Sequence, residues 1–324
     1  MSTVSDALDA LTDLQPDRAR ITADILHGLS QHPRQLPSKY FYDARGSALF
    51  EQITRQPEYY PTRTELGLLQ DRAADIAGVV GPHLHVVELG SGSGRKTEIL
   101  LQALVDPVAY TPIEISRAAL LDSVARLAPA LPEIEMLPVC ADFTRPVQLP
   151  EPEREPARRL VFFPGSTLGN FAGAEAVALL RAMRQTMGEG GLALIGIDLH
   201  KDPALIEAAY NDAAGVTAEF TLNLLRRLNR EIGSDFDLGG FAHRARYSVE
   251  RLRIETDLVS LRDQQVHVGG RTFDFAAGEA MRVEYSHKYT EASFAALAAE
   301  AGLQVSHRWD AQAPAFGLRL LRAC

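Results

Sequence analysis

Apolar and polar positions along the middle of this chain form blocks that predict helices and strands in alternation. A helix is expected over residues 64–77, and a short apolar strand at 85–89 leads into a glycine-rich segment at 90–94. The remaining strands of this part are predicted at 108–113, 134–139, 160–163 and 192–197, with helices at 117–127 and 174–187. Such alternation is typical of an α/β fold with a parallel, doubly wound sheet.

The alternation stops after Asp198 and returns near Thr290. Residues 204–230 predict mainly helix, and two runs rich in β-forming residues, 247–261 and 264–275, predict antiparallel strands. A helix at 291–301 and strands at 303–309 and 317–321 then predict an antiparallel edge of the first sheet. We therefore expect a Rossmann-like sheet domain formed by residues 64–200 and 291–324. A discontinuous α+β domain is expected from residues 1–63 and 201–290.

Charge and cysteine content narrow the range of partners. The 324 residues include 42 acidic and 33 basic side chains, a formal charge of −9 without a long run of either sign. No nucleic-acid or anionic-membrane surface is therefore expected. Cys140 and Cys324 have no CxxC spacing, which argues against a disulfide framework and a zinc site. With neither a signal-peptide pattern nor an apolar stretch of about 18 residues, we expect a cytoplasmic monomer acting on a small molecule.

The glycine-rich segment predicts a ligand site. Gly90 and Gly92 stand where a strand turns into a helix, so that the backbone can approach a ligand without a Cβ in the way. In dinucleotide enzymes such a turn holds a pyrophosphate. Glu88, the acid at the end of the strand, instead suits a cationic ligand such as S-adenosylmethionine.

Further polar residues follow the next strands. Glu114 comes some two dozen positions after the turn, where an acid can accept hydrogen bonds from both ribose hydroxyls, and Asp142 and Phe143 are placed to bind the amino group and the face of adenine. Each carboxylate alone is also compatible with a solvated strand end. Lys96 is either a surface lysine or the partner of the cofactor's carboxylate, because cations are otherwise disfavoured at a helix N-terminus.

Longer motifs carry a more specific resemblance. They are YFYD at 40–43, EYYPTRTE at 58–65, GSTLGN at 165–170, YNDAAGVT at 210–217, DFAAGE at 274–279 and EYSHKY at 284–289. From about residue 30 onward the chain closely resembles the histidine Nα-methyltransferase of the ergothioneine pathway. The resemblance implies a class I methyltransferase sheet, S-adenosylmethionine as methyl donor, and trimethylation of free L-histidine to hercynine, the first step of ergothioneine biosynthesis.

The resemblance also implies roles for matching residues. Asn170 and Tyr210, with Tyr59 nearby, would hold the α-carboxylate and amine end of the substrate. Glu284 and Ser286 would hold the imidazole nitrogens, and Tyr42 and Phe50 would line the compartment in which the amine meets the methyl group. Thr256 departs from the family, which carries a methionine there against the substrate ring, and this departure bears on substrate shape.

The chemistry of these side chains fits the implied roles. Glu284 and Ser286 are two positions apart in a predicted strand, so they face the same side. A carboxylate accepts from one imidazole N–H, whereas a hydroxyl serves the other nitrogen in either direction. Asn170 and Tyr210 are also compatible with a helix cap and a core aromatic.

Three other functions remain open from the sequence. A related N-methyltransferase acting on tryptophan is disfavoured by the Glu284 and Ser286 pair, since indole offers one N–H only. A nucleotide-dependent oxidoreductase would use the glycine turn for NAD and would not bind S-adenosylhomocysteine. A non-catalytic S-adenosylmethionine sensor would bind the cofactor without methylating an amino acid. No metal is required by any of the assigned residues.

Overall fold

The structure, a computed structural model, describes residue 7 and residues 9–324. These residues form two compact units. The first, the sheet unit, contains Pro61–His200, Lys288–Cys324 and the segment that ends at Gln15. The second unit contains Pro16–Tyr60 and Lys201–His287, so each unit is built from separate stretches of the chain.

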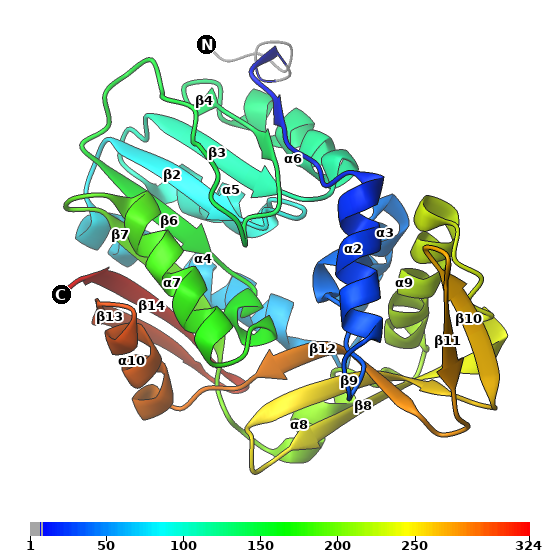
Figure 1. The fold of residues 1–324 in the computed structure, drawn as a ribbon. Helices are drawn as coiled ribbons and strands as arrows, with labels where there is room; N and C mark the ends of the chain where they lie inside the picture. Colours follow the sequence, from blue (N-terminus) through cyan, green and yellow to red (C-terminus); the bar gives the residue numbers. More distant parts are fainter. Residues whose placement is uncertain (1–6, 8) are drawn as a thin grey trace. The chain divides into compact units, whose positions relative to one another are not determined.

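The sheet unit is built on one mixed sheet (Figure 1). In spatial order its main path is β1 (Thr12–Asp13), β5 (Val139–Cys140), β3 (Ala109–Glu114), β2 (Leu84–Leu89), β6 (Arg158–Phe163), β7 (Leu192–Asp198), β14 (Ala315–Ala323) and β13 (Leu303–Gln312). The strands from β1 to β7 are parallel, whereas β14 and β13 form an antiparallel edge. This arrangement confirms the predicted fold class and places the carboxyl ends of the parallel strands along one edge.

Helices cover both faces of this sheet. The helices α4 (Tyr60–Val80), α5 (Arg95–Ala103) and α6 (Arg117–Ala130) contribute to one apolar core. A second core on the opposite face includes α7 (Ala174–Met187) and α10 (Glu291–Glu300). Helix α10 begins with a capping box between Thr290 and Ser293, which stabilises the return of the chain into this unit. Among the helices of residues 9–324, none is long and apolar enough to span a membrane.

Two boundaries in the sheet unit differ from the sequence prediction. The expected strand at 134–139 is divided into β4 (Glu135–Met136) and β5, both paired with β3, because Pro138 between them lacks the N–H that a continuous ladder needs. Near the N-terminus, Thr12 pairs with Val139, so this part of the segment predicted for the second domain belongs to the sheet. Residues 1–6 and 8 of that prediction lie outside the described residues.

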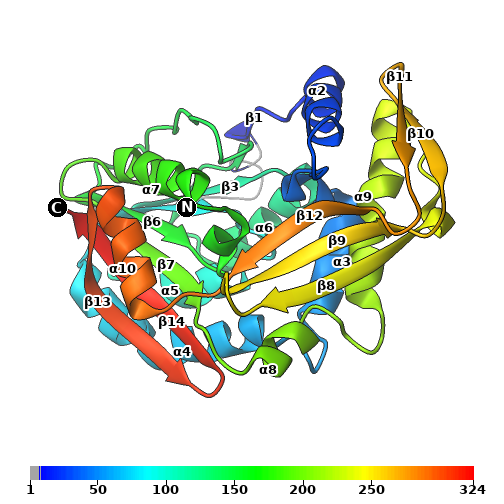
Figure 2. The same cartoon turned by 60° about the horizontal axis from the view of Figure 1, so that its bottom comes forward.

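The second unit combines helices with a small sheet. Its helices are α2 (Arg18–Leu29), η1 (Ser38–Phe41), α3 (Ala44–Ile53), α8 (Pro203–Ala208), α9 (Val216–Ile232) and η3 (Leu238–Gly240). Its antiparallel sheet has the order β12 (Ala280–His287), β9 (Arg253–Ser260) and β8 (Phe241–Ser248), which Figure 2 shows side by side. Helix α9 packs closely with α3 and β8, and apolar residues of these three elements share one core.

Tight turns in this unit were missed by the sequence prediction. The run at 264–275 is a hairpin of β10 (Gln264–Val268) and β11 (Arg271–Phe275), turned at Gly269 and Gly270, which both have positive φ. The run at 247–261 likewise contains the turn between β8 and β9, where Leu252 has a φ of 49°. The prediction that residues 204–230 are mainly helical is confirmed by α8 and α9, although the chain leaves the helix between them.

Candidate active site

The glycine turn joins β2 to α5 at the carboxyl edge of the sheet. Gly90, Gly92 and Gly94 have φ values of 74°, 49° and 66°, which a residue with a Cβ rarely adopts. The Ser91 side chain between them is buried, and its Oγ has no hydrogen-bond partner within the described part of the chain. An unpartnered buried hydroxyl beside backbone free of Cβ atoms fits a turn built to receive a polar ligand.

Glu88 is buried in β2, two residues before Gly90. Its Oε2 accepts hydrogen bonds from the Thr97 hydroxyl at 2.6 Å and from the Tyr110 hydroxyl. Burial raises the pKa of Glu88 to about 8, against the effect of these hydrogen bonds, so the carboxyl is mostly neutral at pH 7. A neutral carboxyl attracts a cation only weakly, and the predicted contact of Glu88 with a sulfonium stays a prediction.

Glu114 ends β3 directly beside the glycine turn. Its two carboxylate oxygens accept the backbone N–H of Gly92 at 3.1 Å and that of Ser116 at 3.0 Å. Burial raises the pKa of Glu114, although the backbone hydrogen bonds oppose this shift. Each carboxylate oxygen keeps a second lone pair, so the position remains suitable for accepting ribose hydroxyls.

Phe143 and Asp142 follow β5 on the same edge. A Cβ placed on Gly90 would lie 3.4 Å from the Phe143 ring, so this ring and the glycine turn are neighbours. The ring also contacts Phe163 and Phe171, with centroid distances of 5.6 and 6.4 Å. Asp142 Oδ1 accepts from the Thr144 backbone N–H at 3.0 Å, which fixes the direction of its carboxylate.

Lys96 stands in the first turn of α5 and is not a freely solvated surface lysine. Its Nζ lies 2.6 Å from Glu65 Oε2, and 18% of its side chain is exposed, while Glu65 is fully buried. Glu65 belongs to the motif at residues 58–65, but no role was predicted for it from the sequence. A single acidic residue in a predicted helix gives no local signal that its side chain is buried.

Asn170 is the one predicted substrate residue of the sheet unit. It ends the short helix η2 (Thr167–Asn170), which follows β6 and the residues Gly165 and Ser166. Ser166 has a φ of 56°, and its Oγ accepts the backbone N–H of Asp198 at 2.8 Å. The segment that carries Asn170 is thus tied to the end of β7.

The other predicted substrate residues all belong to the second unit. Four of them form a row of aromatic rings, with centroid distances of 5.8 Å from Tyr42 to Phe50, 6.1 Å from Phe50 to Tyr59, and 6.3 Å from Tyr59 to Tyr210. Each contact is edge-to-face, the arrangement preferred by aromatic pairs. At the end of this row, the Tyr210 hydroxyl lies 2.6 Å from Ser286 Oγ.

A β-bulge decides which face of β12 carries Glu284 and Ser286. Before the bulge, Met281 of β12 pairs with Leu258 of β9. After it, Glu284 pairs with Thr256 and Ser286 pairs with Ile254. The extra residue shifts the alternation by one, so Glu284 and Ser286 share the face of the buried Met281. Without it, Tyr285 would take that face instead.

Thr256 lies directly opposite Glu284 in the ladder, so the two side chains point to the same face. It is 1% exposed, and its Oγ1 has no hydrogen-bond partner within the described residues. Thr256 therefore places a small polar group beside Glu284 on the inner face of the sheet.

His243 was not singled out from the sequence, although it contacts the Tyr210 segment. Its Nε2 lies 2.9 Å from the Tyr210 carbonyl oxygen and its Nδ1 lies 3.0 Å from Thr221 Oγ1. Burial lowers the pKa of His243, which favours the neutral ring with Nε2–H donating to the carbonyl. No sequence motif marks this role, because the contact joins β8 to a turn 33 residues away.

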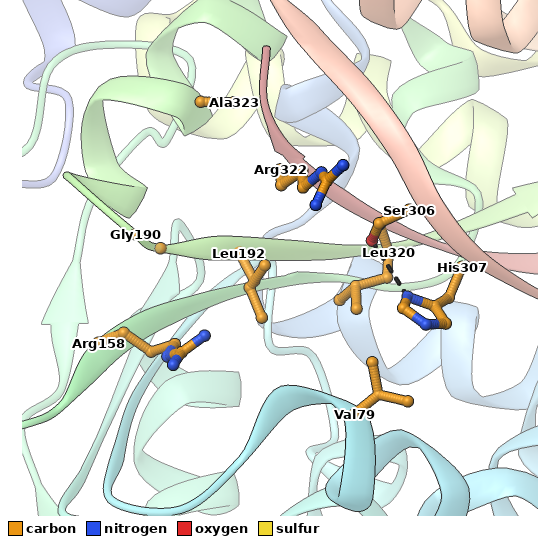
Figure 3. A pocket seen from close by; sticks show the side chains of 10 residues that line it. Val79, Arg158, Gly190, Leu192, Ser306, His307, Leu320, Arg322 and Ala323 are labelled. Carbon is orange, nitrogen blue, oxygen red and sulfur yellow. Dashed lines mark hydrogen bonds between the residues drawn. The ribbon is translucent and has the colours of Figure 1, made fainter.

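A separate cavity of about 380 Å³ lies at the opposite edge of the sheet, at the amino ends of β6 and β7 (Figure 3). Arg158, Leu192, His307 and Arg322 are among its lining residues. The predicted site residues are not part of it, which separates this cavity from the glycine turn.

A family described as histidine-specific, SAM-dependent methyltransferase matches residues 21–323. The chain is 42% identical over 303 residues to the histidine N-alpha-methyltransferase of Mycolicibacterium smegmatis, with 92% of this chain and 93% of that protein covered. The chain belongs to the histidine-specific, SAM-dependent methyltransferase family. It is thus a methyltransferase, and the predicted family, enzyme class and methyl donor are confirmed.

Two more distant relatives frame the substrate question. Ergothioneine biosynthesis protein 1 of Neurospora crassa is 30% identical, over 89% of this chain and 33% of that longer protein. The L-tryptophan methyltransferase of Psilocybe serbica is 28% identical, over 94% of this chain and 93% of that protein. Relatives of this methyltransferase thus bear the names of two different amino-acid substrates.

Proposed function

We propose that this methyltransferase transfers methyl groups from S-adenosylmethionine to the α-amino group of free L-histidine, three times in succession, and releases hercynine for ergothioneine biosynthesis. One observation carries the choice of substrate. Glu284 and Ser286 share the inner face of β12, and the Ser286 hydroxyl is oriented by Tyr210. This arrangement supplies an acid and a hydroxyl for the two nitrogens of an imidazole ring.

The Glu284 carboxylate accepts the N–H of the imidazole, and the Ser286 hydroxyl serves the second nitrogen. Because the Tyr210 hydroxyl lies at 2.6 Å from Ser286 Oγ, it limits the directions in which Ser286 can donate. A ring with one polar nitrogen forms only one of these two hydrogen bonds. A lost hydrogen bond costs about 0.5–1.5 kcal/mol, enough to discriminate between amino acids.

The residues around the glycine turn fit the methyl donor. Glu114 accepts the ribose hydroxyls, Asp142 binds the adenine amino group, and Phe143 covers the adenine face. The ammonium of Lys96 binds the carboxylate of the donor's amino-acid part, and the turn from Gly90 to Gly92 lets that part lie against the backbone. When bound, the donor supplies a sulfonium-activated methyl group, so the protein's contribution is alignment and exclusion of water.

The protein must also present the amine in its neutral form. Asn170 and Tyr210 offer an amide and a hydroxyl to the carboxylate and amine end of the substrate, so they hold it without a negative charge that would stabilise the ammonium. The Tyr42 hydroxyl, or a water on Tyr59, relays to solvent the proton that the amine loses. Phe50 with Tyr42 and Tyr59 forms an aromatic wall that attracts the growing methylated cation.

The relative named for tryptophan makes an N-methyltransferase of tryptophan the second candidate function. The Thr256 side chain beside Glu284 is smaller than the methionine of the resemblance and leaves more room for a ring. Indole, however, donates one N–H and accepts nothing, so it satisfies one of Glu284 and Ser286 but not both.

The proposed setting is a monomer in the cytoplasm that needs no nucleic acid, as the net charge of −9 supports.

The deciding experiment for the substrate is incubation of the purified chain with S-adenosylmethionine and single amino acids, followed by mass spectrometry for one, two and three added methyl groups. Histidine should react strongly and tryptophan weakly. Equal trimethylation of tryptophan would contradict the proposal, and light scattering of the same sample checks the monomer.

A further inference from the structure

Glu65 is a carboxylate in the first turns of α4 that has no exposed surface. Two partners satisfy it. The backbone N–H of Gly165 donates to Oε1 at 3.0 Å and to Oε2 at 2.8 Å, and Lys96 Nζ lies 2.6 Å from Oε2. Removing one partner from a buried ion pair leaves an uncompensated charge, so these contacts are what makes the burial possible.

The opposite side of this carboxylate rests on the sheet. A Cβ on Gly196, in β7, would lie 2.1 Å from Glu65 Oε1 and 3.3 Å from the Gly165 nitrogen. Position 196 therefore has to remain free of a side chain while Glu65 occupies this place. The carboxylate is confined between β7, Gly165 and the first turn of α5.

Glu65 thus connects two functional segments of the sheet unit. Lys96 comes two residues after Gly94, the last glycine of the turn, and Gly165 opens the segment that ends with Asn170. A Cβ on Gly165 would lie 3.4 Å from Lys96 Nζ, which shows that the two partners of Glu65 are also neighbours of each other.

We propose that Glu65 is a positioning residue that fixes the Lys96 ammonium for the carboxylate of the methyl donor. The proposal rests on the proposed function, in which Lys96 binds that carboxylate. A lysine ammonium is a compact charge on a flexible four-carbon stem, which loses rotamer entropy when it is held in one position. The Glu65 contact restricts that stem and uses one of three N–H donors, which leaves the others for the ligand.

Charge at the end of α5 gives a second reason for this arrangement. A lysine in the first turn of a helix meets the positive end of the helix dipole, which disfavours it. The buried carboxylate of Glu65 compensates for that repulsion at 2.6 Å. Without Glu65, the ammonium gains by turning toward solvent, away from the turn.

The test uses E65Q, because glutamine keeps the size and an oxygen that accepts from Gly165 but removes the charge facing Lys96. Binding is measured by calorimetry with two probes. S-adenosylhomocysteine carries the amino-acid part of the donor, whereas 5′-methylthioadenosine lacks it. For E65Q we expect a Kd for S-adenosylhomocysteine raised at least tenfold and a Kd for methylthioadenosine within twofold of the parent. Equal weakening of both probes, or no weakening of either, would overturn the proposal.

A double-mutant cycle with K96M tests whether E65Q weakens S-adenosylhomocysteine binding through Lys96. If Glu65 acts through Lys96, E65Q adds less than twofold in the K96M background, whereas multiplication of the two effects would overturn the proposal. The matched control is D75N on the same helix, where Asp75 accepts from Trp309 Nε1 at 2.6 Å, and it should leave both Kd values unchanged. If K96M itself leaves S-adenosylhomocysteine binding intact, the Lys96 assignment and the Glu65 proposal both fall. Histidine methylation by the parent would still stand as a separate result.

Discussion

The Tyr210 hydroxyl and Ser286 Oγ lie 2.6 Å apart, although 76 residues separate them in the chain. This contact joins the aromatic row that begins at Tyr42 to the strand that carries Glu284. It gives the Ser286 hydroxyl a fixed direction before a substrate binds, which lowers the ordering cost of recognition.

The first prediction concerns this hydrogen bond. Y210F removes the hydrogen bond between Tyr210 and Ser286 and should raise the KM for histidine about tenfold, since such a loss costs about 1–3 kcal/mol. The Kd for S-adenosylhomocysteine should stay unchanged. Y285F is the control, because Tyr285 alternates to the outer face of β12, where its ring packs 4.0 Å from the Arg253 guanidinium carbon. Additive effects of Y210F and S286A in steady-state kinetics would mean that the two hydroxyls act separately.

The second prediction concerns Glu284. E284A removes the acceptor for one imidazole N–H and should lower kcat/KM for histidine by about 30-fold or more, corresponding to ~2 kcal/mol. The control E250Q changes an exposed acid in the turn between β8 and β9 and should match the parent. Unchanged turnover of E284A would remove Glu284 from the substrate site.

The third prediction concerns the aromatic wall. Phe50 lies 5.8 Å from Tyr42 and 6.1 Å from Tyr59, measured between ring centroids. F50L should slow the later methylations more than the first, so that mono- and dimethylhistidine accumulate, because cation–π attraction of about 0.5–2 kcal/mol grows with the methylated cation. Mass spectrometry of a time course measures the three products. F273L, a substitution at another buried ring of the same unit, should change the rates of all three methylation steps by the same factor. Unchanged rates for all three steps in F50L would end the aromatic-wall idea.

The fourth prediction is a pH dependence of stability. The pKa of Glu88 is raised from an ordinary 4.5 to about 8 by burial, so the folded protein retains a proton that the unfolded chain releases. The contribution is complete below about pH 4.5 and is lost as the pH rises toward 8. E88Q should therefore flatten the decline in the free energy of unfolding between pH 5 and 8, as measured by urea denaturation. E98Q, on the surface of α5, should keep the decline of the parent. A parent curve without any decline would contradict the assignment.

The fifth prediction concerns a buried ion pair at the end of β7. Lys288 Nζ lies 3.0 Å from Asp198 Oδ2, and the two side chains are 1% and 0% exposed. K288M leaves the Asp198 carboxylate buried without this partner and should cost about 3–5 kcal/mol of unfolding free energy. D198N/K288M should be less destabilised than the sum of the single variants in urea denaturation. Simple additivity would show that the pair is not coupled.

The sequence determined the local chemistry of this protein. The spacing of apolar residues and the positions of turn residues predicted the order of strands and helices in the sheet unit. Each parallel strand is a short apolar run that ends at turn residues. The positive φ values of Gly90, Gly92 and Gly94 match the glycines that marked the turn. The two-residue spacing of Glu284 and Ser286 predicted a shared face, which the ladder shows.

Only the tertiary structure decided which face of β12 carries Glu284 and Ser286, and which carboxylates of the sheet unit are buried. The bulge between Arg282 and Glu284 turns Glu284 and Ser286 inward, a choice that strand periodicity alone leaves open because one extra residue inverts the alternation. The burial of Glu88 in β2 and of Glu65 against Gly196 likewise depends on packing between distant segments. The sequence does not distinguish a carboxylate in contact with water from one paired with a lysine. Only the fold determines the environment of the carboxylate and thereby its pKa.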